Sequence, residues 1–207
     1  MIKAVLFDVD GVLLDSDDGL VEMFAGAVES VGYARPSRGE VLAHVGLPAA
    51  EWLRLLMPGA SDGAVEKAVA HVRKVWPTIV SGIKPMRDAE ETLRGLQACG
   101  VKIAIVTNQK GKDALLSARR FSVPFNEVVF LSDDFRPKPA PDLLLEALRR
   151  LCVDKPEALF VGDTGIDVET GKAAGVRTVI LAHERNAGLN AERIGSLLEL
   201  LKMVDGK

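Results

Sequence analysis

Five short runs of Val, Ile, Leu and Phe constrain the fold of this 207-residue chain more than any other feature. They are continuously apolar rather than alternating, which is typical of parallel strands covered by helices on both faces. The runs occupy residues 4–7, 101–106, 127–131, 158–161 and 176–181. Helical spacing of apolar residues follows the later runs, at 88–99, 141–151, 167–174 and 190–203. The pattern predicts an α/β fold with a doubly wound parallel sheet of five main strands.

The long gap between the first and second runs has a different character. Nothing in residues 15–83 is typical of a strand, and helical spacing recurs at 17–31, 38–45, 49–57 and 62–80 between Gly and Pro breaks. We therefore expect a small α-helical cap domain, residues 15–83, inserted after the first strand. The catalytic core would comprise residues 1–14 and 84–207, with hinges at 14–18 and 82–85.

Composition narrows the function classes. The net charge is −3 and no basic run is present, which argues against a nucleic-acid partner. The apolar runs are far shorter than a membrane span, and the N-terminal residues enter a strand directly, unlike a secretion signal. Cys99 and Cys152 have no metal-like spacing, and we expect reduced, buried thiols. A cytoplasmic protein without nucleic-acid or membrane partners is expected.

Two carboxylates close the first run. Asp8 and Asp10 stand at alternate positions of an extended segment and would point the same way, with Gly11 allowing a sharp turn behind them. One could act as a nucleophile while the other carries protons to and from a leaving group. Alternatively, such a pair lies in a solvated loop or caps a helix.

Polar groups also close the second and fourth runs. Thr107 and Asn108 could cradle a phosphate, or simply cap the next helix. Gly162 and Asp163, with Asp167 at a helix start, could bind Mg²⁺ through carboxylates, or serve only as helix caps.

Lys138 lies in a loop among three prolines, Pro137, Pro139 and Pro141, which would fix a point charge beside a phosphate. A loop lysine is otherwise solvated. The joint occurrence of these signals favours a metal-assisted phosphoryl-transfer centre, since the carboxyl ends of parallel strands meet at one edge.

As an ordered set, these motifs resemble the haloacid dehalogenase-like hydrolase superfamily over residues 1–14 and 84–185, which implies a Rossmann-like core. The resemblance implies that Asp8 is phosphorylated, Asp10 is the general acid/base, and Thr107, Asn108 and Lys138 bind phosphate. It also implies Mg²⁺ held by the Asp8 carboxylate, the Asp10 carbonyl and Asp163. Asp167 would hold Lys138 or a metal-bound water, with Gly11 and Gly162 in support. Gln109 stands where the family often has Lys or Ser, outside the expected chemistry.

The helical insertion is similar to the cap of the phosphoglycolate phosphatase and β-phosphoglucomutase branch. Asp10 favours phosphate-ester cleavage over dehalogenation, because the dehalogenases lack an acid there. The resemblance implies a Mg²⁺-dependent phosphatase acting on a small phosphorylated metabolite through an aspartyl-phosphate. A sugar phosphomutase and a non-catalytic phospho-acceptor or binding protein remain alternatives. In the cap, the 44–47 turn is a candidate specificity loop, and Arg35, Arg38, His44, Arg54 and Arg73 are candidate anion contacts.

Overall fold

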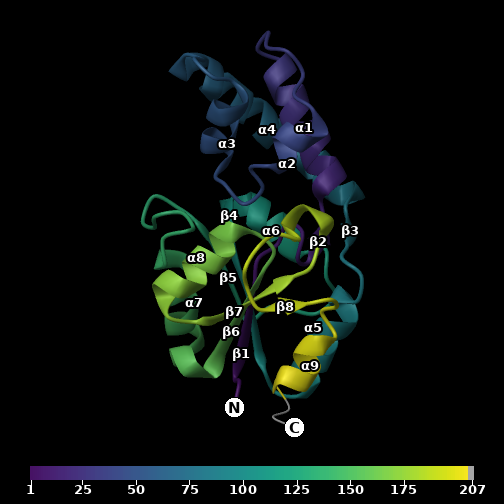
Figure 1. Ribbon diagram of the computed structural model, residues 1–207, viewed down its shortest axis with the longest axis vertical. Helices are drawn as coiled ribbons and strands as arrows, with labels where there is room; N and C mark the ends of the chain where they lie inside the picture. Colours follow the sequence, from purple (N-terminus) through teal and green to yellow (C-terminus); the bar gives the residue numbers. More distant parts are fainter. Residues whose placement is uncertain (205–207) are drawn as a thin grey trace.

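The structure is a computed structural model that describes residues 1–204, and its centre is a parallel sheet (Figure 1). The strand order is β5-β4-β1-β6-β7-β8, and every adjacent pair is parallel. The strands are β1 (Ala4–Phe7), β4 (Lys102–Lys110), β5 (Glu127–Leu131), β6 (Ala158–Gly162), β7 (Arg177–Leu181) and β8 (Arg193–Ile194). The five expected strands are present, which confirms the α/β fold, and β8 adds a short sixth at the edge.

Strand β1 lies at the point where the winding of the sheet reverses. The chain first adds β4 and β5 on one side of β1, then returns to add β6, β7 and β8 on the other. The connections diverge at this point and leave a crevice at the carboxyl ends of β1, β4 and β6, where ligands bind in such sheets.

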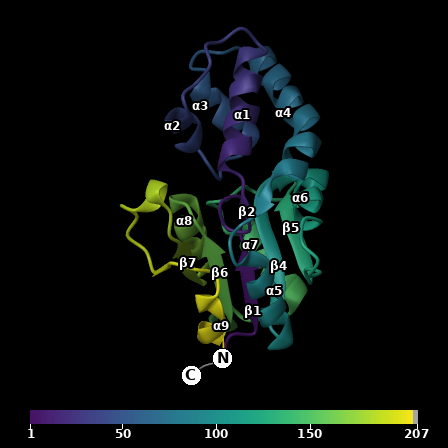
Figure 2. The ribbon, with the colours of Figure 1, turned by 90° about the vertical axis from the view of Figure 1, so that its right-hand side faces the viewer.

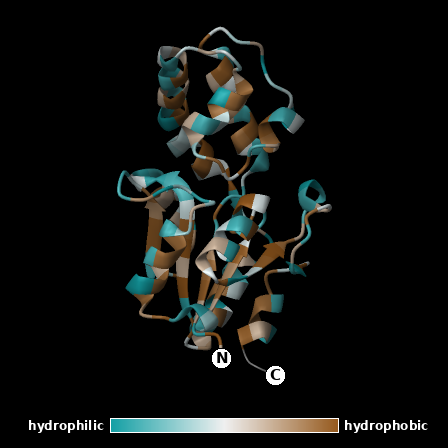
Figure 3. Ribbon diagram, turned by 60° about the vertical axis from the view of Figure 1, so that its left-hand side comes forward, coloured by the Kyte–Doolittle hydropathy of each residue, from teal (hydrophilic) through white to brown (hydrophobic). Residues whose placement is uncertain are grey.

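Helices cover both faces of the sheet because successive strand residues point to opposite sides. Ala4 and Leu6 pack beneath α7 (Asp142–Leu151) and α8 (Gly165–Ala174), whereas Val5 and Phe7 belong to a second core. That core includes residues of α5 (Ala89–Ala98) and α9 (Glu199–Val204), and α6 (Gly111–Ala118) packs against β4 and β5. Figure 3 shows the strands as the most apolar part of the ribbon. A short 3₁₀ helix, η1 (Lys155–Glu157), precedes β6.

Four helices stand beyond the carboxyl edge of the sheet (Figure 2). They are α1 (Asp17–Glu29), α2 (Arg38–Leu42), α3 (Ala49–Leu56) and α4 (Asp62–Gly82). Phe24 of α1 stacks on Trp52 of α3 with ring centroids 3.9 Å apart, and α4 packs along α1 and α3. The sequence located all of these helices. Our division into a cap of residues 15–83 and a core stays a prediction.

The two chain crossings between core and helices form a small antiparallel ribbon where we expected only hinges. Strand β2 (Leu14–Asp15) pairs with β3 (Lys84–Pro85), with Leu14 opposite Pro85 and Asp15 opposite Lys84. Strands of two residues carry no periodicity, so no sequence pattern could indicate them.

The prediction of a helix over residues 190–203 is wrong. Ile194 belongs to β8 and pairs with Leu181, and α9 begins only at Glu199. Glu199 Oε1 accepts hydrogen bonds from the backbone N–H groups of Gly195 (2.7 Å) and Ser196 (3.0 Å), so it closes the start of α9. Ser196 followed three residues later by Glu199 is a helix-start signature that apolar spacing concealed.

The expectation of buried thiols is also wrong, because Cys99 and Cys152 are exposed at the C-terminal caps of α5 and α7. Within residues 1–204, no helix combines the length and apolar character needed to cross a membrane.

Candidate active site

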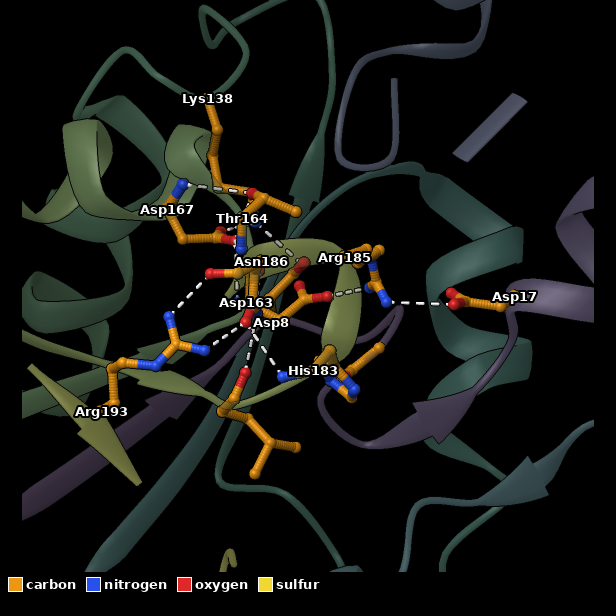
Figure 4. A network of polar contacts seen from close by, with 12 residues as sticks. Asp8, Asp17, Lys138, Asp163, Thr164, Asp167, His183, Arg185, Asn186 and Arg193 are labelled. Atoms are coloured by element: carbon orange, nitrogen blue, oxygen red, sulfur yellow. Dashed lines mark hydrogen bonds and ion pairs between the residues drawn. The ribbon is translucent and has the colours of Figure 1, made fainter. Parts of the chain in front are cut away.

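A buried ion-pair triad lies at the carboxyl edge of the sheet (Figure 4). Asp8 follows β1 directly, and its Oδ1 is 2.8 Å from Lys138 Nζ. The same ammonium lies 2.8 Å from Oδ1 of Asp167, in the first turn of α8. All three side chains are less than 5% exposed. Three separate segments thus bring one positive and two negative groups together out of contact with bulk water.

Burial dominates the electrostatics of this triad. It raises the pKa of Asp8 to about 7 even though the Lys138 ammonium favours the carboxylate. The Lys138 ammonium alone therefore does not offset the loss of water around the Asp8 carboxylate. Burial also opposes ionisation of Asp167, but Lys138 and Thr164 lower its pKa below the ordinary value. Both acids raise the pKa of Lys138 against the effect of burial.

Asp10 faces the same space from the turn after β1. Its Oδ2 accepts a hydrogen bond from Gln109 Nε2 at 2.8 Å, and Gln109 Oε1 in turn accepts one from Ser117 Oγ at 2.8 Å. Burial raises the pKa of Asp10, and Gln109 opposes that rise. Gln109, which we expected to stand outside the chemistry, therefore contacts the Asp10 carboxyl directly.

Two glycines permit the close approach of these segments. Gly11 has φ +79°, and a Cβ there would overlap the Asp163 carboxylate and the Arg185 guanidinium. A Cβ on Gly162 would overlap the side chain of Asp167. Both positions therefore require glycine so that the β1 turn, β6 and α8 can meet.

Thr107 and Asn108 lie near the end of β4, and the strand continues to Lys110 instead of ending in a helix cap. Thr107 is buried beside the acid pair, and its Oγ1 accepts from Gln109 N–H at 3.1 Å. The Asn108 amide donates to the carbonyl oxygens of Gly46 (2.8 Å) and Lys138 (3.1 Å) and accepts from Lys138 N–H at 2.8 Å. The Asn108 side chain thus holds the Lys138 loop and the turn of residues 44–47. Its expected contact with phosphate stays a prediction.

Asp8, Asp163 and Asp167 form a buried cluster that could hold a cation, because their carboxylate oxygens lie within 4.8 Å of one another. Asp163 is fully buried, burial raises its pKa well above the ordinary range, and its Oδ1 has no hydrogen-bond partner within residues 1–204. Asp167 is less available, since its oxygens already accept from Lys138 and from Thr164, whose own side chain caps α8. Clustered carboxylates with an unpartnered buried oxygen are the hard donors that Mg²⁺ prefers, so the residues fit this ion.

Sequence reasoning missed the residues that follow β7. Arg185, in the 3₁₀ helix η2 (Glu184–Asn186), forms ion pairs with Asp163 and with Asp17 of α1, the latter at 3.1 Å. Asn186 Nδ2 donates to the Asp163 carbonyl at 2.8 Å, and His183 Nε2 donates to the Gly11 carbonyl at 2.6 Å. Their position directly after an expected strand was the available signal, because that strand ends at the same edge.

A cavity of about 340 Å³ extends from Asp8 and Asp10 towards the helices of residues 15–83. The backbone of Gly46, with Leu47, reaches its wall from the turn that we singled out. Of the candidate cap cations, Arg73 lines this cavity, whereas His44 faces a separate hollow beside Asp163. Arg38 lines the same hollow as His44 and pairs with Asp18. Arg35 and Arg54 pair with surface acids.

Comparisons with known proteins agree with this geometry. Residues 5–181 match the family described as haloacid dehalogenase-like hydrolase. The pyrophosphatase PpaX of Halalkalibacterium halodurans is 30% identical over 184 residues, covering 88% of this chain and 84% of that protein. A phosphoglycolate phosphatase of Rhodobacter capsulatus is 30% identical over 186 residues, covering 87% and 84%. The crystal structure of a HAD-superfamily hydrolase from Geobacter sulfurreducens superposes with a TM-score of 0.74 at 29% identity, covering 98% and 96%. The expected resemblance is confirmed, and the chain belongs to the haloacid dehalogenase-like hydrolase family.

Proposed function

We propose that this hydrolase is a Mg²⁺-dependent phosphatase that cleaves a small phosphate monoester through an aspartyl-phosphate on Asp8. The observation that carries the proposal is the Asp8 carboxylate itself. It is buried, it is paired with Lys138 at 2.8 Å, and it borders a cavity shared with Asp10. A buried carboxylate open only to such a cavity is suited to attack a bound phosphorus atom.

The first half of the reaction transfers the phosphoryl group to the protein. An Asp8 carboxylate oxygen forms a bond to phosphorus as the bond from phosphorus to the leaving oxygen breaks. Asp10 donates its proton to the departing alkoxide, and the raised pKa of Asp10 supports the protonated form that this step needs. Lys138 and Thr107 offset negative charge on the transferred oxygens.

The second half returns the protein to its starting state. Asp10, now a carboxylate, accepts a proton from water while the water oxygen attacks the phosphorus of the aspartyl-phosphate. Inorganic phosphate leaves, and Asp8 regains its carboxylate. We propose that residues 15–83 act as the cap domain that limits access of bulk water during the first half.

Mg²⁺ would be held by the carboxylates of Asp8 and Asp163 and by the Asp10 carbonyl. When bound, the ion supplies positive charge that favours ionised Asp8 and neutralises the phosphoryl oxygens. Asp167 retains its bond to Lys138 at 2.8 Å and so keeps that ammonium beside Asp8.

The names of the relatives suggest pyrophosphate and phosphoglycolate as first substrates to assay. We expect phosphate release from at least one ester in a panel with Mg²⁺ and none with EDTA. Asp8→Asn should lower kcat by roughly 10⁴-fold or more, as for loss of a nucleophile. Asp154→Asn, which changes an exposed acid before β6, is the matched control. Turnover by Asp8→Asn at the wild-type rate would refute the nucleophile assignment. Transfer of phosphate between sugar hydroxyls without release would instead favour a phosphomutase.

A further inference from the structure

We propose that the natural substrate is the phosphate ester of an apolar, ring-bearing alcohol. This inference rests on the proposed function and concerns the part of the cavity beyond the acid pair. There the wall is built by cap side chains, and they differ sharply in chemistry from the cluster around Asp8.

The side of the cavity formed by residues 15–83 is lined mainly by apolar side chains. Phe24, Trp52 and Trp76 line it together with Val69 and Val72. The indole nitrogen is the only polar atom of each tryptophan side chain, and both donate to protein carbonyl oxygens. The rings therefore line the cavity without a free donor.

The indole N–H groups are used inside the protein. Trp52 Nε1 donates to the Val41 carbonyl oxygen at 2.9 Å, and Trp76 Nε1 donates to the Asp113 carbonyl oxygen at 3.4 Å. A sugar or polyol would lose water hydrogen bonds against such a wall and gain none, which is unfavourable. An apolar ring loses nothing and buries its surface.

The charges around the cavity also disfavour a second anionic group. Among the described residues that line the cavity, the cations are Arg73 and Lys110, and both are exposed. Arg73 acts electrostatically on Asp113, and Lys110 lies 3.8 Å from Asp133. Glu51 and Asp113 line the cavity as well. Pyrophosphate and phosphoglycolate each carry a second anionic group, which would lie near these carboxylates without a dedicated partner.

The volume limits the size of the leaving group. About 340 Å³ lies near the lower end of the range for small-molecule sites, roughly 300–1,000 Å³. The cap turn closes one side, because the Gly46 carbonyl accepts from the Asn108 amide at 2.8 Å. The phosphoryl group and about one ring system would fill this space.

A pair of esters that differ by one ring tests the inference. Ethyl phosphate and 2-phenylethyl phosphate have similar leaving alkoxides, and phosphoglycolate and pyrophosphate complete the set. We expect kcat/KM for 2-phenylethyl phosphate to exceed the other three on the order of tenfold or more, as burial of an aromatic ring predicts. Equal or higher kcat/KM for ethyl phosphate, phosphoglycolate or pyrophosphate overturns the inference and leaves the phosphatase proposal intact.

Two variants test where in the cavity the phenyl ring of the substrate binds. Val69→Phe narrows the cavity and should lower the ratio of kcat/KM for 2-phenylethyl over ethyl phosphate at least threefold, or about 0.7 kcal/mol. Val75→Phe makes the same change at a similarly half-buried position of α4 outside the cavity, and should leave that ratio unchanged. An unchanged ratio in both variants contradicts the proposed position of the ring.

Binding can be measured without turnover. The chain has two tryptophans, Trp52 and Trp76, and both line the cavity, so their fluorescence reports its occupancy. In Asp8→Asn with Mg²⁺, 2-phenylethyl phosphate should bind at least tenfold more tightly than ethyl phosphate. If no ester is hydrolysed by the wild type, the proposed function fails, and this titration still decides the inference. Equal affinities overturn it.

Discussion

The two sides of the cavity differ in the kind of contact that holds their side chains in place. On the core side, Asp8, Asp10 and Lys138 are each held by directed polar contacts of 2.8 Å. On the cap side, Trp52 and Trp76 are held by apolar packing and turn their single donors away. Directed contacts fix reacting atoms, whereas an apolar wall discriminates by shape and solvation. We infer that the core determines whether an ester is cleaved, and that the cap determines which ester is bound.

The largest effect that tests this difference between core and cap is the loss of kcat expected for Asp10→Asn. Loss of the proton donor should lower kcat roughly 10²–10⁴-fold. Because Asp10 is proposed to act only on the leaving oxygen, and the two alkoxides are similar, the factor should be the same for ethyl and 2-phenylethyl phosphate in steady-state assays. A loss confined to one ester would show that Asp10 contributes to selection. Asp154→Asn again serves as the exposed control.

Lys138→Met tests whether the core side depends on its buried cation. The variant keeps the side-chain length but leaves Asp8 and Asp167 without their shared partner. Removal of one partner from a buried ion pair should lower the free energy of unfolding by about 3–5 kcal/mol. Urea denaturation in EDTA measures this change, with the exposed Lys172→Met as control. Equal stability of the two variants would contradict the structural importance of the triad.

The pH dependence of stability sharpens the contrast, because only the core side carries buried acids with raised pKa values. The pKa of Asp8 rises from the ordinary 3.8 to about 7 on folding, so the folded state binds more protons between these values. In EDTA, the free energy of unfolding should therefore fall as pH rises from about 4 to about 7, on the order of 1 kcal/mol or more. Burial of Asp10 and Asp163 acts in the same direction.

Asp8→Asn should flatten this pH profile, since it removes the group that takes up the proton. Urea denaturation of wild type and variant at pH 5 and pH 8 provides the comparison. A wild-type protein that gains stability over this range in EDTA would contradict the raised pKa of Asp8.

The smallest expected effect concerns Arg185, which spans the two sides. Its guanidinium pairs with the proposed metal ligand Asp163 and with Asp17 of the cap. Arg185→Gln frees Asp163 and should tighten Mg²⁺ binding severalfold, within one factor of ten. Isothermal titration with Mg²⁺ measures it, with Arg177→Gln, which breaks an exposed pair to Glu192, as control. Weaker binding in Arg185→Gln would show that the arginine supports the metal site instead of competing for it.

Sequence reasoning was most successful for polar residues that directly follow an apolar strand. Asp8, Thr107 and Asp163 follow apolar runs whose carboxyl ends had to meet, so their gathering could be predicted. Their assigned roles stay predictions. The contribution of Arg185 could not be predicted in the same way, because no apolar pattern indicates how the chain turns from β7 into η2.

The helices of residues 15–83 show a second limit of prediction from sequence. Val69 and Val75 both belong to the apolar periodicity of α4, yet only Val69 borders the cavity. Periodicity indicates which face of a helix is apolar, but tertiary packing decides whether that face meets another helix or a substrate. The Asn108 amide illustrates the same point, because its partners Gly46 and Lys138 are distant in sequence.

The β2–β3 ribbon has a consequence for engineering. Leu14 and Pro85 are cross-strand neighbours, and Met86 N–H donates to the Leu13 carbonyl at 2.8 Å, so the inserted segment departs and returns at adjacent points. Antiparallel neighbours are close enough for a two-residue turn to join them. Grafting a different insert between Asp15 and Lys84 would therefore leave the backbone of the parallel sheet undisturbed. The ribbon is thus a position at which the segment between Asp15 and Lys84 could be exchanged for another without moving the strands of the core.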